Sequence, residues 1–174
     1  GGGALLDAGS YPLSLIRLVM GDAPQRVIAE SRPGPSGVDV GTTATLLWDD
    51  GRRAQMACAM DVNIHRHATL VGSDGHIETE YLNHTAAAPT GHPQGYQPSL
   101  MRVRRGPTGA VPLEVVTSPV GSGFRFAAEA FAKVVASRDV DAIERAASAS
   151  LDIAAMMDAI VSSARTGQAA DVQQ

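Results

Sequence analysis

The segments of this sequence with β-strand character lie in its middle, with helical segments before and after them. Apolar residues recur every three to four positions from Ala4 to Met20, and again in Phe124–Val134 and Ile143–Val161, which predicts helices. The expected strands between them are Arg26–Arg32, Thr43–Trp48, Arg52–Asp61, Ala68–Val71, His76–Leu82, Leu100–Arg105 and Leu113–Thr117. This order is typical of an α+β fold, in which an open, largely antiparallel sheet has helices packed on one face.

Turn sequences rich in glycine, proline and aspartate separate the expected strands. Asp49–Gly51 and Ser73–Gly75 have the composition of hairpin turns, which join antiparallel neighbours. Residues 83–98 are irregular and are expected to form a surface loop. A length of 174 residues fits one domain, so we expect residues 1–167 to form a single domain and residues 168–174 a frayed tail.

Charge and hydropathy exclude several classes of partner. The net charge is −4, and the basic residues are scattered apart from Arg102, Arg104 and Arg105, so no nucleic-acid partner is expected. No apolar run approaches the roughly 20 residues that cross a bilayer, which argues against a membrane partner. The single cysteine, Cys58, makes no intrachain disulfide, which fits a reducing, cytoplasmic location and a structural rather than reactive thiol.

The familiar cofactor and metal motifs are missing. The sequence has no G-x-G-x-x-G after an expected strand, no P-loop, no H-E-x-x-H and no paired C-x-x-C. His65 and His67 can share one strand face, but neither an acidic nor a thiol side chain lies at ligand spacing from them. We therefore expect no metal site, no cofactor-binding residue and no Rossmann domain in this chain.

One pair of polar residues has the spacing of a catalytic pair. Asp7 and Tyr11 lie four positions apart, so a helix places both on one face, one turn from each other. A tyrosine phenol, with an ordinary pKa of about 10, can exchange a proton with a substrate hydroxyl when a nearby cation favours the phenolate. The aspartate can orient that hydroxyl. The spacing by itself fits better a helix with a polar face, on which Asp7 and Tyr11 meet solvent or cap a neighbour.

The sheet face opposite the helices also needs an explanation. Its expected residues are small or modestly apolar: Ala57, Ala59, Val103 and Val116. Such a flat surface can pack against a second subunit, and it can equally be solvated.

Motifs along most of the chain resemble one known family. The stretch Gly1–Gly21 (GGGALLDAGSYPLSLIRLVMG) resembles the start of the second domain in the glucose-fructose oxidoreductase / inositol dehydrogenase / MocA (Gfo/Idh/MocA) oxidoreductase family. Further motifs are similar in the same order: Gly37–Asp39, Asp49–Gly51, Val71–Ile77, Phe124–Phe131 and the last helix through Gly167. The tyrosine followed by proline is similar to the branch with dihydrodiol and xylose dehydrogenases.

The resemblance implies a role for this chain within a longer enzyme. It would be the C-terminal, substrate-binding and oligomerisation half of an NAD- or NADP-dependent dehydrogenase acting on a sugar, a polyol or a dihydrodiol. Tyr11 would be the proton donor or acceptor, and Asp7 would orient the substrate hydroxyl. The open sheet face would form a homodimer.

The same resemblance shows what this sequence lacks. The family's Glu-Lys-Pro motif and its dinucleotide-binding loop belong to an N-terminal Rossmann domain, and neither is present here. We therefore expect a fragment that is inactive alone. The alternative is a non-catalytic, free-standing sheet module that dimerises or acts as a scaffold.

Overall fold

The computed structural model describes residues 2–63, 65–79, 100–119 and 121–173. The chain divides into two compact units rather than the single expected domain. The first unit comprises Gly1–Asn63 and Val140–Gln174, and the second comprises Ile64–Asp139.

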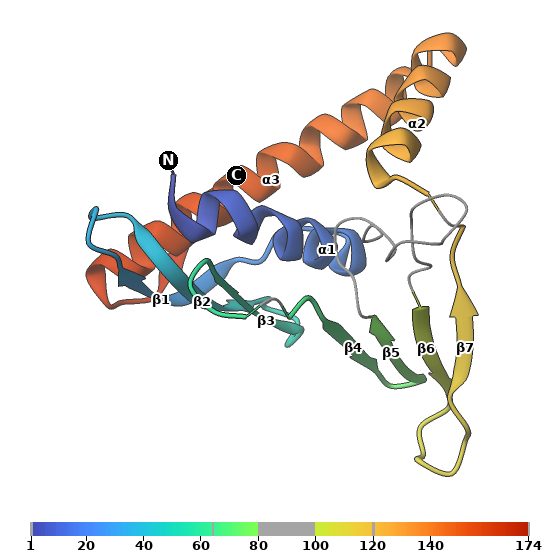
Figure 1. Ribbon diagram of the computed structural model, residues 1–174, viewed down its shortest axis with the longest axis horizontal. Helices are drawn as coiled ribbons and strands as arrows, with labels where there is room; N and C mark the ends of the chain where they lie inside the picture. The colour runs from blue at the N-terminus through green and yellow to red at the C-terminus, as the bar shows by residue number, and fades with distance from the viewer. Residues whose placement is uncertain (1, 64, 80–99, 120, 174) are drawn as a thin grey trace. The chain divides into compact units, whose positions relative to one another are not determined.

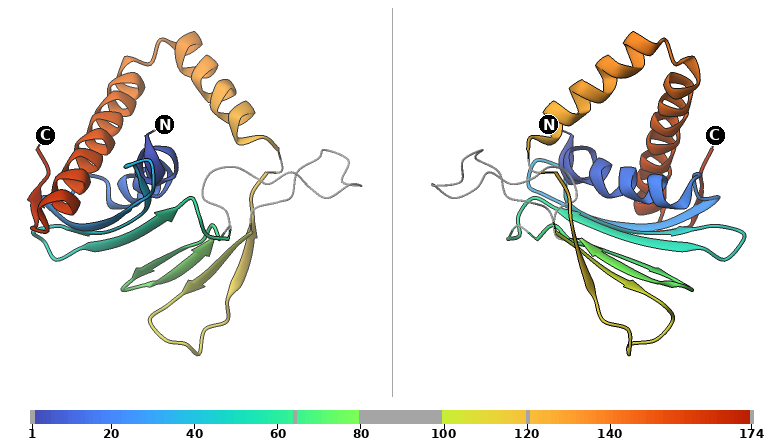
Figure 2. Two further views of the ribbon diagram at one scale, coloured as in Figure 1. Left: turned by 60° about the vertical axis from the view of Figure 1, so that its left-hand side comes forward. Right: turned by 90° about the vertical axis from the view of Figure 1, so that its right-hand side faces the viewer.

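The first unit is an antiparallel sheet covered on one face by helices. Its strands are β1 (Arg26–Pro33), β2 (Asp39–Leu47), β3 (Arg53–Ala59) and β8 (Ala170–Asp171), in the order β3-β2-β1-β8. Its helical segments are η1 (Leu5–Gly9), α1 (Ser10–Met20) and α3 (Val140–Thr166). Helices α1 and α3 lie on the same side of the sheet (Figures 1 and 2).

The core of this unit forms where the helices meet the sheet. Alternate strand residues point toward the helices because successive side chains of a strand face opposite sides. The fully buried ones among them include Val27 and Leu46, which are paired across β1 and β2. Leu13 of α1 and Met156 and Ile160 of α3 are equally buried. Each such side chain stabilises the unit by about 1.5–3 kcal/mol relative to exposure.

An ion pair joins the two helices at the edge of the core. The guanidinium Nε of Arg17 in α1 lies 2.6 Å from Oδ2 of Asp152 in α3, and both side chains are mostly buried. Further along α3, Met156, Ala159, Ile160 and Ser163 recur at helical spacing on the buried side.

Residues 168–174, expected to be a frayed tail, contain strand β8. Ala170 pairs with Val27 of β1, and the Val172 N–H donates to the carbonyl of Gln25 at 2.9 Å. Gly167, with φ of +66°, ends α3 and turns the chain back toward the sheet. This turn brings the backbone of Ala170 and Asp171 to the edge of β1, where it pairs as strand β8.

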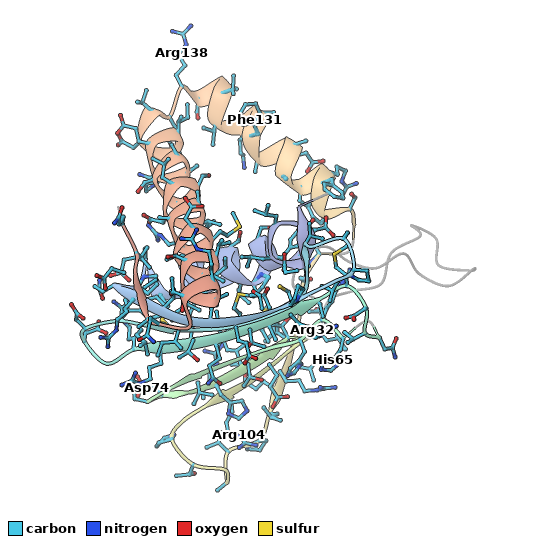
Figure 3. All side chains as sticks on the ribbon, turned by 90° about the vertical axis from the view of Figure 1, so that its left-hand side faces the viewer. Arg32, His65, Asp74, Arg104, Phe131 and Arg138 are labelled. Atoms are coloured by element: carbon cyan, nitrogen blue, oxygen red, sulfur yellow. The ribbon has the colours of Figure 1, made fainter. Side chains whose placement is uncertain are left out.

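The second unit contains the remaining strands and one helix. Strands β4 (Ala68–Gly72), β5 (Gly75–Thr79), β6 (Leu100–Arg105) and β7 (Glu114–Thr117) form an antiparallel sheet in sequence order, and Asp74 lies at the β4–β5 turn (Figure 3). Helix α2 (Gly123–Ser137) is capped at its start by Ser122, whose hydroxyl accepts the Arg125 N–H, and at its end by Arg138. Residues 80–82 of the expected strand and the expected loop 83–98 lie outside the described residues.

Helix α2 does not bury its apolar face. No residue of α2 is buried, and Phe131 is 70% exposed (Figure 3). The expected packing of helices on a sheet is therefore confirmed for α1 and α3 and not for α2.

The α+β class and the antiparallel strand pairing are confirmed, with two four-stranded sheets where one was expected. The expected open face needs a correction, because Val103 is buried whereas Ala57 is exposed. Val103 pairs with Ile77 within the second sheet, so it shares no sheet with Ala57. Among the described helices, none has the length and apolar character needed to cross a bilayer.

Candidate active site

The helix that carries Asp7 and Tyr11 begins with a wide turn. Leu5–Gly9 is a π-helical turn, and α1 follows it without a break. Pro12 has no N–H to donate to the carbonyl of Ala8, so the α-helical ladder is interrupted at that carbonyl. The predicted helix over Ala4–Met20 is thus confirmed, and the change of helix type falls at Gly9. Such π turns occur often at functional sites.

The two sides of this helix differ sharply in burial. Leu5, Gly9 and Leu13 are buried, and they face β2, β3 and the core. Asp7 is exposed, and Tyr11 is 44% exposed. The structure thus places both predicted site residues on the accessible side, four positions apart, where a ligand can reach them.

Gly9 allows the helix to lie close to β3. A Cβ atom at Gly9 would lie 2.8 Å from Leu5 Cδ1 and 3.4 Å from Cys58 Sγ. Cys58 is half-buried beneath the helix, and burial raises the pKa of its thiol. These observations support the prediction of a structural cysteine, since a raised pKa leaves the thiol protonated and unreactive.

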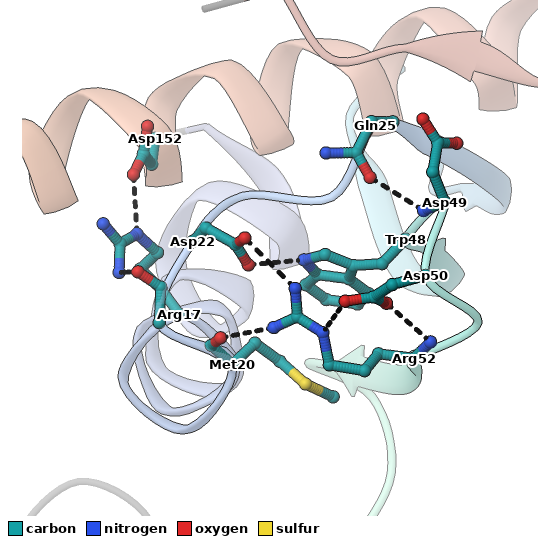
Figure 4. Close-up of polar contacts among 10 residues, drawn as sticks. Arg17, Met20, Asp22, Gln25, Trp48, Asp49, Asp50, Arg52 and Asp152 are labelled. Carbon is teal, nitrogen blue, oxygen red and sulfur yellow. Dashed lines mark hydrogen bonds and ion pairs between the residues drawn. The ribbon is translucent and has the colours of Figure 1, made fainter.

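Polar contacts fix the other end of α1 to the β2–β3 hairpin (Figure 4). The guanidinium of Arg52 donates to Asp50 Oδ2 at 2.7 Å, to Asp22 Oδ2 at 3.1 Å and to the carbonyl of Met20, the last residue of α1. The indole N–H of Trp48 donates to Asp22 Oδ1 at 2.8 Å. We call Asp22, Trp48, Asp50 and Arg52 the clasp, because together they attach the C-terminal end of α1 to the sheet.

The clasp shifts the ionisation of its members. Hydrogen bonding to Arg52 is the main cause that lowers the pKa of Asp22, and the Arg52 backbone N–H is the main cause for Asp50. The pKa of Arg52 is raised, chiefly by its hydrogen bond to Asp22. Both carboxylates therefore stay charged in mildly acidic solution.

The sequence predicts a turn at one part of this clasp and does not predict the contacts that the clasp makes. The motif Asp49–Gly51 predicts the hairpin correctly, but its spacing gives no sign that Arg52 reaches back to Asp22 and Met20. A glycine that ends a helix, followed directly by an aspartate as in Gly21-Asp22, is the only local signal.

The described residues do not fit a dinucleotide. The closest approach to a glycine-rich loop before a helix is Gly121-Ser122-Gly123 at the start of α2, and Phe126 stands where the third glycine of G-x-G-x-x-G would be needed. A Cβ atom at Gly121 would lie 2.8 Å from the Phe126 ring, so the space beside this glycine is filled by the protein itself.

Nor do the described residues contain a cluster of three or more His, Cys, Asp or Glu side chains that could hold a metal ion. The rings of His65 and His67 stack with centroids 5.6 Å apart, and His67 Nε2 lies 3.1 Å from Thr69 Oγ1.

The N-terminal part of the chain matches a known domain family. Residues 1–78 match the GFO/IDH/MocA C-terminal domain, and the resemblance drawn from the sequence is confirmed. The matched residues include Asp7, Tyr11 and the clasp, and they end within β5.

Two relatives are dehydrogenases. The chain is 33% identical over 79 residues to trans-1,2-dihydrobenzene-1,2-diol dehydrogenase of Danio rerio, which covers 45% of this chain and 24% of that protein. It is 29% identical over 178 residues to D-xylose 1-dehydrogenase (NADP(+)) 2 of Haloferax volcanii, and this alignment covers 98% of this chain and 48% of that protein. The chain therefore spans less than half the length of either relative.

A solved structure shows the same fold. KijD10, a 3-ketoreductase from Actinomadura kijaniata in complex with NADP and TDP-benzene, is 26% identical, with a TM-score of 0.73. The comparison covers 94% of this chain and 46% of that one. The similarity extends beyond residue 78 and includes the segment that the family match leaves out.

Proposed function

We propose that the chain is the C-terminal, substrate-binding half of an NAD(P)-dependent oxidoreductase acting on a sugar, a polyol or a dihydrodiol by hydride transfer. The names of the two dehydrogenase relatives and the NADP complex of KijD10 support this class of reaction. NAD or NADP would supply the hydride chemistry from an N-terminal domain, since the described residues here do not fit it.

One observation carries the proposal. Asp7 and Tyr11 lie within the family-matched segment, on the exposed side of a helix whose opposite side is buried against the sheet. Burial of that opposite side gives the helix a fixed orientation. A fixed helix holds a polar pair in a constant position relative to a substrate, which loop residues seldom achieve.

In this proposal Tyr11 moves the proton and Asp7 orients the substrate. The Tyr11 phenolate takes a proton from the substrate hydroxyl as the alcohol is oxidised, and the phenol so formed returns a proton in the reverse direction. The Asp7 carboxylate accepts a hydrogen bond from a substrate hydroxyl. A cation near Tyr11 would favour the phenolate, and we propose that the N-terminal domain provides it, since the only lysine here is Lys133 on α2.

Replacing Tyr11 by phenylalanine tests this proposal. In the enzyme that contains this chain, we expect Tyr11→Phe to lower kcat about 100-fold or more, because the proton transfer loses its acid or base. Ser14→Ala is the matched control, since it removes an exposed hydroxyl from the same helix. An unchanged kcat for Tyr11→Phe would exclude Tyr11 as the proton-transfer residue.

We further propose that the chain by itself has no dehydrogenase activity and acts in the cytoplasm as a homodimer. Dimerisation would use the open face of the first sheet. Its rows across β1, β2 and β3 include Ile28–Thr45–Gln55 and Glu30–Thr43–Ala57. The 52% exposure of Ile28 on a face without helices supports this choice of surface.

A further inference from the structure

The first turn of the site helix receives a carboxylate from a distant part of the chain. The N–H groups of a helix's first turn have no partner inside the helix. Ala4, which precedes η1, has no polar side chain to serve as a cap. Instead, the Leu5 N–H donates to Oδ2 of Asp39 at 2.8 Å, although Asp39 lies 34 residues further along. A negative charge is favourable at this end of a helix.

The same carboxylate oxygen is anchored in the sheet. The Thr42 hydroxyl donates to Asp39 Oδ2 at 2.9 Å. The hydroxyls of Thr42 and Ser31 lie 2.7 Å apart, so Ser31 donates to Thr42 because the Thr42 proton is already used. Thr42 is only 2% exposed. A partly buried chain of hydrogen bonds thus runs from β1 through β2 to the first turn of the helix.

Asp39 reaches the helix because the ladder between β1 and β2 is irregular. Strict alternation would place Asp39 and Thr42, three positions apart, on opposite faces of β2. The register shifts between Arg32 and Pro33, where Pro33 pairs with Asp39. Such an irregularity turns a side chain to the other face. Because the Asp39 carboxylate accepts hydrogen bonds from both Thr42 and Leu5 of the helix, the Asp39 side chain lies on the face of the sheet that the helix covers.

Gly3 leaves room for this carboxylate. Its φ of +81° favours glycine, and a Cβ atom there would lie 1.9 Å from Asp39 Oδ1. Glycine at this position therefore leaves the Asp39 carboxylate in place, where a side chain would displace it.

We infer that Asp39 is a positioning residue for the proposed reaction, fixing through Leu5 the rotation of the helix that presents Asp7 and Tyr11. This inference rests on the proposed function. Asp39 bonds to Leu5, on the buried side of the same turn that carries Asp7 on its exposed side. A displacement of about 1 Å at a reacting group can cost about 100-fold in rate.

The test compares Asp39→Ala and Asp39→Asn in the enzyme that contains this chain. We expect Asp39→Ala to lower kcat by about 10- to 100-fold while the KM for the cofactor stays nearly constant. Asp39→Asn should retain most of kcat, because a single amide oxygen can accept from both Leu5 and Thr42, as Oδ2 does. Asp61→Ala is the control, since the exposed carboxylate of Asp61, two residues after the end of β3, pairs with Arg32 instead.

A double-mutant cycle with Tyr11→Phe separates positioning from a merely structural role. If Asp39 acts through Tyr11, Asp39→Ala should lower kcat by no more than about threefold in the Tyr11→Phe background. Equal losses in both backgrounds would overturn the inference, as would an Asp39→Ala enzyme no slower than the Asp61→Ala enzyme. In both cases the proposed function would stand. An unchanged rate for Tyr11→Phe alone would instead overturn the proposed function and this inference together.

Gly3→Ala perturbs the same contact independently. It should lower kcat as Asp39→Ala does, because the new methyl group occupies the place of Asp39 Oδ1. Gly21→Ala, at the other end of α1, is its matched control, since φ there is +86° but nothing lies within 4 Å of the new atom. Equal kcat values for the two alanine variants would contradict the inference, because backbone strain alone would then explain the loss.

Discussion

At the scale of single residues, close approaches decide which side of the site helix is buried. Gly9 lies over Cys58 and Leu5, whose side chains restrict what can replace it, whereas its helical φ of −71° suits any residue. An alanine gains about 1 kcal/mol of helix propensity over glycine, which offsets the tight contact with Leu5. A β-branched side chain has no such compensation.

We therefore predict that Gly9→Val destabilises the protein by about 1–3 kcal/mol, whereas Gly9→Ala is close to neutral. Urea unfolding followed by circular dichroism measures both. The two variants differ only in side-chain volume at one position. Equal stabilities would mean that the contact with Cys58 is looser than the structure shows.

Sequence patterns predicted the site at this scale only where the signal was local. The four-residue spacing of Asp7 and Tyr11 is visible in the sequence, and the structure places both on the exposed side. The contact between Leu5 and Asp39 joins residues 34 positions apart, and it depends on a register shift. No local pattern reveals such a shift. The sequence analysis therefore identified Asp39 only as part of the motif Gly37–Asp39 and did not predict its contact with Leu5.

At the scale of elements, periodicity predicted strands well and their ends poorly. The expected strand Arg26–Arg32 lacks only the last residue of β1, Pro33. The expected strand Thr43–Trp48 lacks the first four residues of β2. Those residues include Gly41 and the irregular pairing at Asp39, which break the alternation that identifies a strand. Strand β8 has two residues, too few for any periodic signal.

The clasp makes the attachment of α1 to the hairpin sensitive to acid. The ordinary pKa of Asp22 and Asp50 is 3.8, and both are lowered in the folded protein. Groups with lowered pKa values contribute stability above the unfolded value, and that contribution is lost as the pH falls through the folded value. We predict that the free energy of unfolding decreases as the pH falls below about 4.

Arg52→Gln should flatten this dependence in part, because Asp22 loses the side-chain hydrogen bond that is the main cause of its lowered pKa. Asp50 loses the side-chain bond to Arg52 and keeps the backbone N–H of residue 52, the main cause of its own lowered pKa. Urea titrations at several pH values compare the variant with the unchanged protein. Arg32→Gln is the control, since Arg32 lowers the pKa of Asp61 outside the clasp. If Arg52→Gln kept the full acid dependence, the clasp would not be its source.

At the scale of the whole molecule, the open face of the first sheet is the proposed dimer contact. It carries a single large, well-exposed aliphatic side chain, Ile28, in a row with Thr45 and Gln55. A charge placed in the centre of such a contact would have to be desolvated without a partner.

Ile28→Glu should therefore convert the proposed dimer to a monomer, or raise its dissociation constant by at least about tenfold. Equilibrium sedimentation of the full-length enzyme measures this directly. Leu18→Glu is the matched control, because Leu18 is 79% exposed on α1, on the helical side of the sheet. A monomer before any substitution would remove this contact from the proposal.

The first unit is built from both ends of the chain, and this has a consequence for the order in which the protein forms during synthesis. Residues 64–139 are inserted between the strands β1–β3 and the helix that completes their core. The hydroxyl of Ser163 illustrates the separation: it accepts the N–H of Ala29 at 2.9 Å across 134 residues. On the ribosome, β1–β3 emerge before α3, so Val27 and Leu46 lack the α3 part of their core, which includes Met156 and Ile160, until that helix has been made. The whole second unit is translated in that interval, so the emerging sheet needs protection from aggregation for most of its synthesis.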